Sequence, residues 1–274
     1  MSDALSQPTA SNALGGTTNR QGQPLLQVAQ LTKRFGGLAA VDNLSFSLQK
    51  GEILGVIGPN GAGKSTMVSL IGGALAPNSG IIVYQGRDIT RLPPHQRTHL
   101  GIARTFQVTQ PFIELDVREN VMMGAFFGQR GLSRAQALRI ADEVLEQVNL
   151  AHKTTYKGEQ LTIADRKRLE MARALATKPQ LLLLDEVMAG LTPPEVTQAV
   201  ALIRYINGTG VTVLVIEHIV RAIANVSDRI LVLHHGRKIA EDAPSQVLSD
   251  PRVIEAYLGE RYARQHHQQE ETSE

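Results

Sequence analysis

The sequence predicts an α/β fold in which parallel strands are covered by helices. Short apolar strand patterns alternate with helix patterns along most of the chain, and this alternation is typical of parallel sheets. Residues from about 90 to 160 are mostly helical in pattern, so we expect a helical subdomain inserted in the core. Strands are expected at 28–32, 44–48, 52–57, 80–84, 181–184, 211–216 and 229–234, and helices at 64–74, 133–149, 166–177 and 194–207.

The composition is that of an ordinary globular protein and excludes several classes. The 274 residues are 42% apolar and 20% charged, which excludes a fibrous or wholly disordered chain. Lys and Arg number 28 against 26 Asp and Glu, and this net charge of +2 gives no reason to expect nucleic acid as a partner. The chain has no cysteine, which excludes disulfides and thiolate metal sites. No apolar run reaches the ~18–20 residues that a membrane-spanning helix needs.

Two polar ends flank the expected domain at 25–260. Sixteen of residues 1–24 are Ser, Thr, Asn, Gln, Gly or Pro, and no basic start precedes an apolar stretch. We therefore expect a disordered tail rather than a signal peptide, with a short interaction peptide as the alternative. Residues 261–274 are also polar and are expected to form a solvated C-terminal tail.

The sharpest local feature is a glycine-rich stretch that fits the pattern G-x-x-x-x-G-K-[ST], between a buried strand and a helix. Its glycines let backbone N–H groups turn toward oxyanions, and the positive end of the following helix points at the same place. Lys64 adds charge for the β- and γ-phosphates, and Ser65 can complete a Mg²⁺ shell. The alternative, an accidental glycine-rich turn, conflicts with both flanking elements. The predicted phosphate-binding residues are Gly58, Pro59, Asn60, Gly61, Ala62, Gly63, Lys64, Ser65 and Thr66.

A second feature supplies two carboxylates. The apolar strand 181–184 is followed directly by Asp185 and Glu186. A buried strand is a rigid mount, and its carboxyl end is where ligands bind in parallel sheets. Asp185 is expected to hold Mg²⁺, directly or through water, and Glu186 to orient or deprotonate an attacking water. The alternative is a strand that ends in solvated acids, and the neighbouring phosphate loop argues against it.

With both elements in place, the chain resembles the ATP-binding subunits of ABC transporters over about residues 25–260. The resemblance implies a P-loop NTPase of the ABC ATPase type, with an N-terminal antiparallel β subdomain and an inserted helical subdomain at about 90–175. It also implies an enzyme that hydrolyses ATP, with Mg²⁺ as cofactor, to drive transport across a membrane.

The resemblance assigns roles to further positions. Phe35 matches the aromatic ring that stacks on adenine, with an ordinary core phenylalanine as the alternative. Gln107 matches the glutamine that meets Mg²⁺ and the attacking water and links to the membrane partner, and 189–192 match the loop that crosses to a second subunit. His218 matches the histidine that contacts the γ-phosphate. The predicted catalytic residues are Lys64, Gln107, Glu186 and His218, and the predicted metal ligands are Ser65, Gln107 and Asp185.

Three longer stretches, 101–107, 116–121 and 250–260, resemble the branched-chain amino acid uptake branch, which also contains urea and amide importers. This branch implies import of branched-chain amino acids or related small polar solutes. The implied partners are transmembrane permease subunits and a second ATP-binding subunit, with a solute-binding protein reached only indirectly and no nucleic acid. The implied location is peripheral, at the cytoplasmic face of a prokaryotic inner or plasma membrane.

One family motif is altered. The signature usually reads Leu-Ser-Gly-Gly-Gln, but the aligned stretch is 161–165, with Thr162 keeping a hydroxyl for a phosphate oxygen. Ala164 places a Cβ where backbone should approach the γ-phosphate, which is strained if its φ is positive. Asp165 brings a negative charge near that anion unless Arg166 or Lys167 offsets it. We therefore expect a heterodimer with a subunit that carries a regular signature, with a homodimer as the alternative.

Other functions stay open at this point. A nucleotide-gated regulatory subunit with weak or no turnover is compatible with the altered signature. A soluble ABC ATPase of DNA repair or translation is less so, because such proteins typically carry long coiled coils, zinc-binding cysteines or two cassettes in one chain. This sequence has none of these features. A kinase that uses the same loop lacks an evident second substrate pocket.

Overall fold

The computed structural model of the chain describes residues 22–105, 112 and 114–257. The predicted tails therefore lie outside the described residues, apart from 22–24, and so does Gln107.

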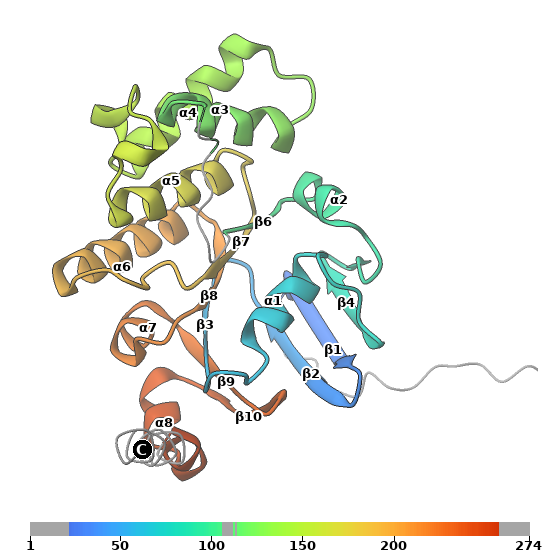
Figure 1. Cartoon of the computed structure of the whole chain (residues 1–274). Helices are drawn as coiled ribbons and strands as arrows, with labels where there is room; N and C mark the ends of the chain where they lie inside the picture. The colour runs from blue at the N-terminus through green and yellow to red at the C-terminus, as the bar shows by residue number, and fades with distance from the viewer. Residues whose placement is uncertain (1–21, 106–111, 113, 258–274) are drawn as a thin grey trace, which may run out of the picture.

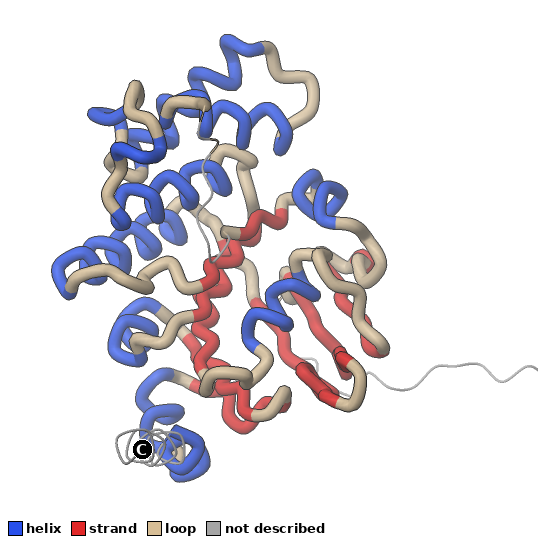
Figure 2. Tube along the Cα trace, viewed as in Figure 1, coloured by secondary structure: helices blue, strands red, loops and turns tan. Residues whose placement is uncertain are grey.

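A six-stranded sheet lies at the centre of the molecule, with strand order β10-β9-β3-β8-β7-β6 (Figure 2). Five of its strands are parallel, and β10 pairs antiparallel with β9 at one edge. Every residue of β3, β7 and β8 is buried, as their nearly continuous apolar sequences require. The strands are β3 Ile53–Ile57, β6 Ile102–Arg104, β7 Leu181–Asp185, β8 Thr212–Ile216, β9 Arg229–His234 and β10 Arg237–Asp242.

A second, four-stranded sheet is antiparallel, with order β2-β1-β4-β5. Its two long strands form a hairpin that turns at Gly36, where φ is +57°. They are about twice as long as the apolar stretches 28–32 and 44–48 that predicted them, because the pairing between them continues to Phe35 and Leu38 at the turn. The strands are β1 Leu26–Phe35, β2 Leu38–Leu48, β4 Ser79–Tyr84 and β5 Arg87–Asp88.

The two faces of the central sheet pack against different layers (Figure 1). One set of alternating side chains joins α5, α6 and α7 in one core, and the other set joins α1 and the antiparallel sheet in a second core. This alternation follows from the period of two along a strand. The helices around the sheets are α1 Lys64–Ile71, α2 Pro94–His99, α5 Ile163–Leu175, α6 Pro193–Gly208, α7 Val220–Val226 and α8 Pro244–Ser249.

The predicted helical insertion is formed by α3 Val117–Gly128 and α4 Arg134–Gln147, which pack on each other, with α3 also contacting α5. Both helices begin with capping boxes, Asp116 with Glu119 and Ser133 with Gln136, which satisfy N–H groups at their first turns. Two short 3₁₀ turns, η1 Ala151–Lys153 and η2 Gly158–Gln160, then lead into α5.

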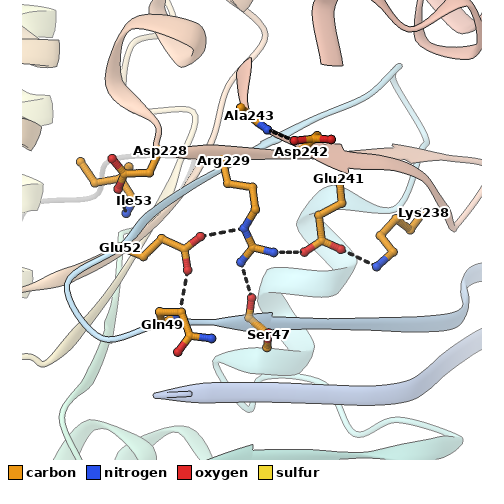
Figure 3. Close-up of polar contacts among 10 residues, drawn as sticks. All are labelled: Ser47, Gln49, Glu52, Ile53, Asp228, Arg229, Lys238, Glu241, Asp242 and Ala243. Carbon is orange, nitrogen blue, oxygen red and sulfur yellow. Dashed lines mark hydrogen bonds and ion pairs between the residues drawn. The ribbon is translucent and has the colours of Figure 1, made fainter. Parts of the chain in front are cut away.

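A charged cluster joins the two sheets at the amino end of β3 (Figure 3). Arg229 Nε donates to Glu52 Oε1 at 2.8 Å, and its Nη2 donates to the Ser47 carbonyl of β2 at 2.6 Å. Arg229 also pairs with Glu241 of β10. Opposite charges and hydrogen bonds raise the pKa of Arg229 despite its partial burial. The cluster lies at the opposite end of β3 from the glycine-rich loop, so it holds the sheets together without entering the candidate site.

Candidate nucleotide-binding site

The glycine-rich loop follows β3 and adopts a backbone that its glycines make accessible. Gly58, Gly61 and Gly63 have φ of +153°, +75° and +100°. A Cβ at Gly58 would lie 2.1 Å from the Leu233 carbonyl oxygen, and one at Gly63 would lie 2.2 Å from that of Ala40. The loop is therefore wedged between β9 and β2, and a side chain at either of these two positions would displace it.

Lys64 is buried and its amine is folded over the loop. Nζ donates to the carbonyl oxygens of Gly58 at 2.6 Å and Pro59 at 2.8 Å. Lys64 is also the first residue of α1, and in the described part of the chain no side chain caps this helix. The first N–H groups of α1 can therefore donate to an anion, and the positively charged Lys64 amine lies beside them.

Asp185 ends β7 with a fully buried carboxylate. Oδ2 accepts from Arg104 Nη2 at 2.9 Å, and Oδ1 is buried with no hydrogen-bond partner among the described residues. Arg104 Nη1 also donates to Ser69 Oγ at 3.0 Å, one turn after Ser65 on α1. An acidic oxygen that lacks a partner, linked to the helix of the phosphate loop, fits a hydrated Mg²⁺.

Glu186 directly follows this strand and has a φ of +53°, which is uncommon for a residue with a side chain. Oε1 lies 2.5 Å from Nε2 of His218, which follows β8. The main chain holds this geometry, because the Glu186 N–H donates to the Ile216 carbonyl at 3.0 Å, and the Glu186 carbonyl accepts from Lys167 Nζ at 3.1 Å. The structure thus brings two predicted catalytic side chains into contact.

Phe35 stands at the turn end of β1 and is 48% exposed, so it is not an ordinary core phenylalanine. The Lys33 amine lies 5.2 Å from the centre of its ring. Phe35 pairs with Leu38 of β2, two residues before Ala40, whose carbonyl lies against Gly63. An exposed aromatic face therefore belongs to the hairpin that packs on the phosphate loop.

The altered signature has a structural role that sequence reasoning did not foresee. Thr162 is the N-cap of α5, where Oγ1 accepts from the Asp165 N–H at 3.2 Å and contacts Asp165 Oδ2 at 2.8 Å. Burial raises the pKa of the Asp165 carboxyl, but hydrogen bonds from Lys153 and Thr162 outweigh it, so the pKa lies below its usual value. Lys153 Nζ is 2.6 Å from Oδ2, and Arg168 adds a longer contact of 3.7 Å to Oδ1.

Two expectations about this stretch are corrected. Ala164 lies in the first turn of α5 and has no positive φ, so the expected backbone strain does not arise. Asp165 is not offset by Arg166 or Lys167, because the Arg166 guanidinium donates to the Gly158 and Glu159 carbonyls and Lys167 donates to Glu186. The compensating charges are Lys153 and Arg168, which the fold of the helical insertion and of α5 brings to Asp165.

Sequence reasoning also missed Arg104 and Glu217. Arg104 lies in the stretch 101–107, but the sequence gives it no role, because its contact with Asp185 depends on β6 lying beside β7. Glu217 is 1% exposed, and burial raises its pKa to about 7. The available signal was a glutamate that directly follows a largely apolar strand and precedes a candidate histidine.

Comparison with known proteins decides the family. A family model described as ABC transporter matches residues 41–189, and one described as branched-chain amino acid ATP-binding cassette transporter matches 237–263. The high-affinity branched-chain amino acid transport ATP-binding protein LivG of Salmonella typhimurium is 39% identical over 252 residues, which cover 87% of this chain and 99% of LivG. The chain belongs to the ABC transporter family. It is one of that family's ATP-binding cassettes, so the predicted family, fold class and enzyme class are confirmed.

Solved cassettes match the fold over most of their length. The ADP conformation of MJ1267, an ATP-binding cassette of an ABC transporter, is 33% identical with a TM-score of 0.78 and covers 87% of this chain and 100% of its own. A dimeric post-hydrolysis state of the cassette MJ0796, bound to ADP and Pi, is 27% identical with a TM-score of 0.73, covering 80% and 98%. In the described part of this cassette, no helix is both long and apolar enough to cross a membrane.

Proposed function

We propose that this cassette hydrolyses ATP at the loop 58–65 to power import of branched-chain amino acids or related small polar solutes. One observation carries the hydrolytic site. Strands β3, β8 and β7 are consecutive and parallel, so the loop after β3, His218 after β8, and Asp185 and Glu186 at the end of β7 share one edge of the sheet. The solute class rests on the likeness to LivG and on the match at 237–263.

Each side chain has a distinct task in this proposal. Lys64 and the loop N–H groups bind the phosphates of ATP, and Phe35 stacks on the adenine. Ser65, Asp185 and Gln107 would hold Mg²⁺, which would supply charge neutralisation for the phosphates.

The reaction itself falls to Glu186 and His218. Glu186 orients a water toward the γ-phosphorus and accepts its proton, and its contact with His218 holds the carboxylate in place. His218 also donates to the oxygens on which negative charge spreads in the transition state.

Substitution of Glu186 tests this proposal. Glu186→Gln keeps the shape of the side chain and removes its basicity, so we expect ATP binding to persist while turnover of the assembled transporter falls by ~100-fold or more. Lys64→Ala is the contrasting variant and should weaken ATP binding itself. ATP hydrolysis by Glu186→Gln at the parent rate would contradict the role of Glu186.

The assembly is proposed on the same basis. The cassette is placed at the cytoplasmic face of the inner or plasma membrane, bound to transmembrane permease subunits, with a second ATP-binding subunit facing it and a solute-binding protein reached only through the permease. A dimeric cassette such as MJ0796 supports the pairing. Thr162 is proposed to meet the nucleotide that the second subunit binds, although its hydroxyl also caps α5.

The permease surface is proposed to lie at a hollow of about 290 Å³ between α2, α3 and α5. Phe112 and Phe127 line it and are 45% and 68% exposed, so apolar surface is open to a partner. Ala103 and Arg104 line the same hollow from β6, just before Gln107 in the chain. A helix docked there would contact β6, which ends three residues before Gln107 in the sequence.

A further inference from the structure

A buried carboxylate lies between two loops of the candidate site and has no part in the proposed chemistry. Glu217 follows β8 directly and is 1% exposed. Its Oε1 accepts a hydrogen bond from the main-chain N–H of Met188 at 2.6 Å. Met188 belongs to the segment after β7, so this contact spans two strands that are neighbours in the sheet.

The same two segments are joined a second time, by the side chains that flank this contact. His218 contacts Glu186 at 2.5 Å, while Glu217 contacts Met188 at 2.6 Å. Two bonds between residues 186–188 and 217–218 fix both the distance and the rotation of one segment against the other. They extend the pairing of β7 with β8, which ends at Asp185 and Ile216 and at the bond from the Glu186 N–H to the Ile216 carbonyl at 3.0 Å.

Met188 also anchors the loop that follows it. The Met188 side chain is buried, its carbonyl accepts from the Leu191 N–H at 3.2 Å, and Gly190 turns the chain with a φ of +79°. Ala189 and Gly190 are exposed. The loop 189–192 therefore projects from a fixed base, and that base is held by the Glu217 carboxylate.

The surroundings of Glu217 determine how costly its negative charge is. The Glu186 carboxylate repels its charge, the Lys167 amine attracts it, and burial removes water from it. The charged form of Glu217 is therefore costly in this place, and the hydrogen bond from the Met188 N–H offsets part of that cost. Glutamate reaches Met188, whereas a side chain one methylene shorter would fall short.

We infer that Glu217 is a positioning residue. The contacts Glu217–Met188 and His218–Glu186 together form a clamp that holds the loop 188–192 in register with Glu186 and His218. The same clamp therefore orients the catalytic base and sets the surface offered to a second cassette. This inference rests on the proposed function for its consequence in hydrolysis, and on geometry alone for the clamp.

Two substitutions separate the reach of the side chain from its charge. Glu217→Gln keeps an oxygen at the same distance and removes the charge, whereas Glu217→Asp keeps the charge and retracts it. In the assembled transporter we expect Glu217→Gln to keep kcat for ATP hydrolysis within about twofold of the parent. We expect Glu217→Asp to lower kcat about tenfold with KM for ATP within about twofold, because the Glu217–Met188 contact lies outside the loop 58–65 proposed to bind ATP.

Hydrogen exchange of the Met188 amide in the full chain reports on the clamp without any hydrolysis. We expect about tenfold faster exchange in Glu217→Asp and parent-like exchange in Glu217→Gln. Glu52→Gln is the matched control, because Glu52 is another acid with little exposure, at 12%, but belongs to the Arg229 cluster at the other end of β3 (Figure 3). It should leave Met188 exchange and kcat at parent values whatever it does to stability.

Two results would overturn the inference: parent-like exchange and turnover in Glu217→Asp, or a loss in Glu217→Gln as large as that in Glu217→Asp. Failure of the proposed function looks different. In that case the parent assembly itself does not hydrolyse ATP, while Met188 exchange still distinguishes the two variants.

Discussion

At the scale of single residues, Arg104 is the cation that pairs with the buried carboxylate of Asp185. The Arg104 side chain is only 16% exposed, and its guanidinium bridges Asp185 of β7 to Ser69 of α1. Its position three residues before Gln107 puts the bridge at the start of the segment proposed to sense the membrane partner. Arg104 therefore connects the metal-binding acid, the helix of the phosphate loop and the route to the permease.

Removal of this cation leaves a buried charge alone. We expect Arg104→Met to lower the free energy of unfolding by about 2–4 kcal/mol, measured by urea denaturation at pH 7. Arg237→Met removes an exposed arginine that pairs with Asp42, and should cost less than about 1 kcal/mol. Equal losses in the two variants would contradict the role given to the Arg104–Asp185 pair.

The raised pKa of Glu217 makes the folded protein less stable as the pH rises. Burial and the Glu186 charge raise this pKa from 4.5 to about 7, so between these values the folded chain binds the proton more tightly than the unfolded chain. The stabilisation that the neutral carboxyl provides is complete below pH 4.5 and is lost as the pH rises through about 7.

Glu217→Gln cannot ionise, so its stability relative to the parent should grow as the pH rises. We expect a gain of at most about 3 kcal/mol between pH 5 and pH 8, measured as the difference in unfolding free energy at each pH. A difference that does not change with pH would show that the Glu217 carboxyl is not perturbed in the folded protein.

At the scale of elements, α3 carries two adjacent phenylalanines that face different surroundings. Phe127 lines the hollow between α2, α3 and α5, whereas Phe126 does not, although the two rings meet edge to face at 6.4 Å. Both are exposed, at 68% and 46%, so either can be replaced without opening the core.

This pair provides a test of the proposed permease surface. We expect Phe127→Glu to reduce co-purification of the cassette with its permease by about tenfold or more, because a charge would enter an apolar contact. Phe126→Glu is the control and should reduce it by less than about threefold. Parent-like co-purification of Phe127→Glu would move the permease surface elsewhere.

Sequence patterns predicted the elements with strong apolar signals and missed those without. The strands β3, β7, β8 and β9 and the helices α4 and α6 are close to their predicted ranges. The strand β6 has three residues and β10 is largely polar, so neither produces a clear pattern. The hairpin strands extend past their apolar centres because pairing with a neighbour, rather than burial, defines their ends.

In the candidate site, too, some residues could be predicted from the sequence and others could not. Contiguous motifs, such as the loop 58–65 and the pair Asp185 and Glu186, can be read from a single sequence because their chemistry is local. The contacts of Arg104 with Asp185, Lys153 with Asp165, and Glu217 with Met188 join residues 81, 12 and 29 positions apart. They depend on strand order and on the fold of the helical insertion, which no spacing rule specifies.

At the scale of the whole molecule, the altered signature bears on which subunit faces this cassette. Asp165 is neutralised by Lys153 and Arg168 within the chain, and the Thr162 hydroxyl already caps α5. The Thr162 hydroxyl and the Asp165 carboxylate are therefore engaged within this chain, where a regular signature would offer its serine hydroxyl and glycine backbone to a phosphate on another subunit. We therefore propose a heterodimer, in which this chain's own loop faces a regular signature.

Expression of the chain alone and with the second ATP-binding subunit from a neighbouring gene tests this pairing. We expect at least tenfold higher ATP turnover per phosphate loop in the mixed assembly than in the pure chain. Brisk hydrolysis by the pure homodimer would refute the heterodimer.

The most direct measurement of the central claim is a crystal structure of the Glu186→Gln chain with Mg²⁺ and ATP. We predict the triphosphate inside the loop 58–65, the Lys64 amine against the β- and γ-phosphates, and the metal between Ser65 and Asp185. A triphosphate bound elsewhere, or a Lys64 amine that still contacts only the Gly58 and Pro59 carbonyls, would contradict the account.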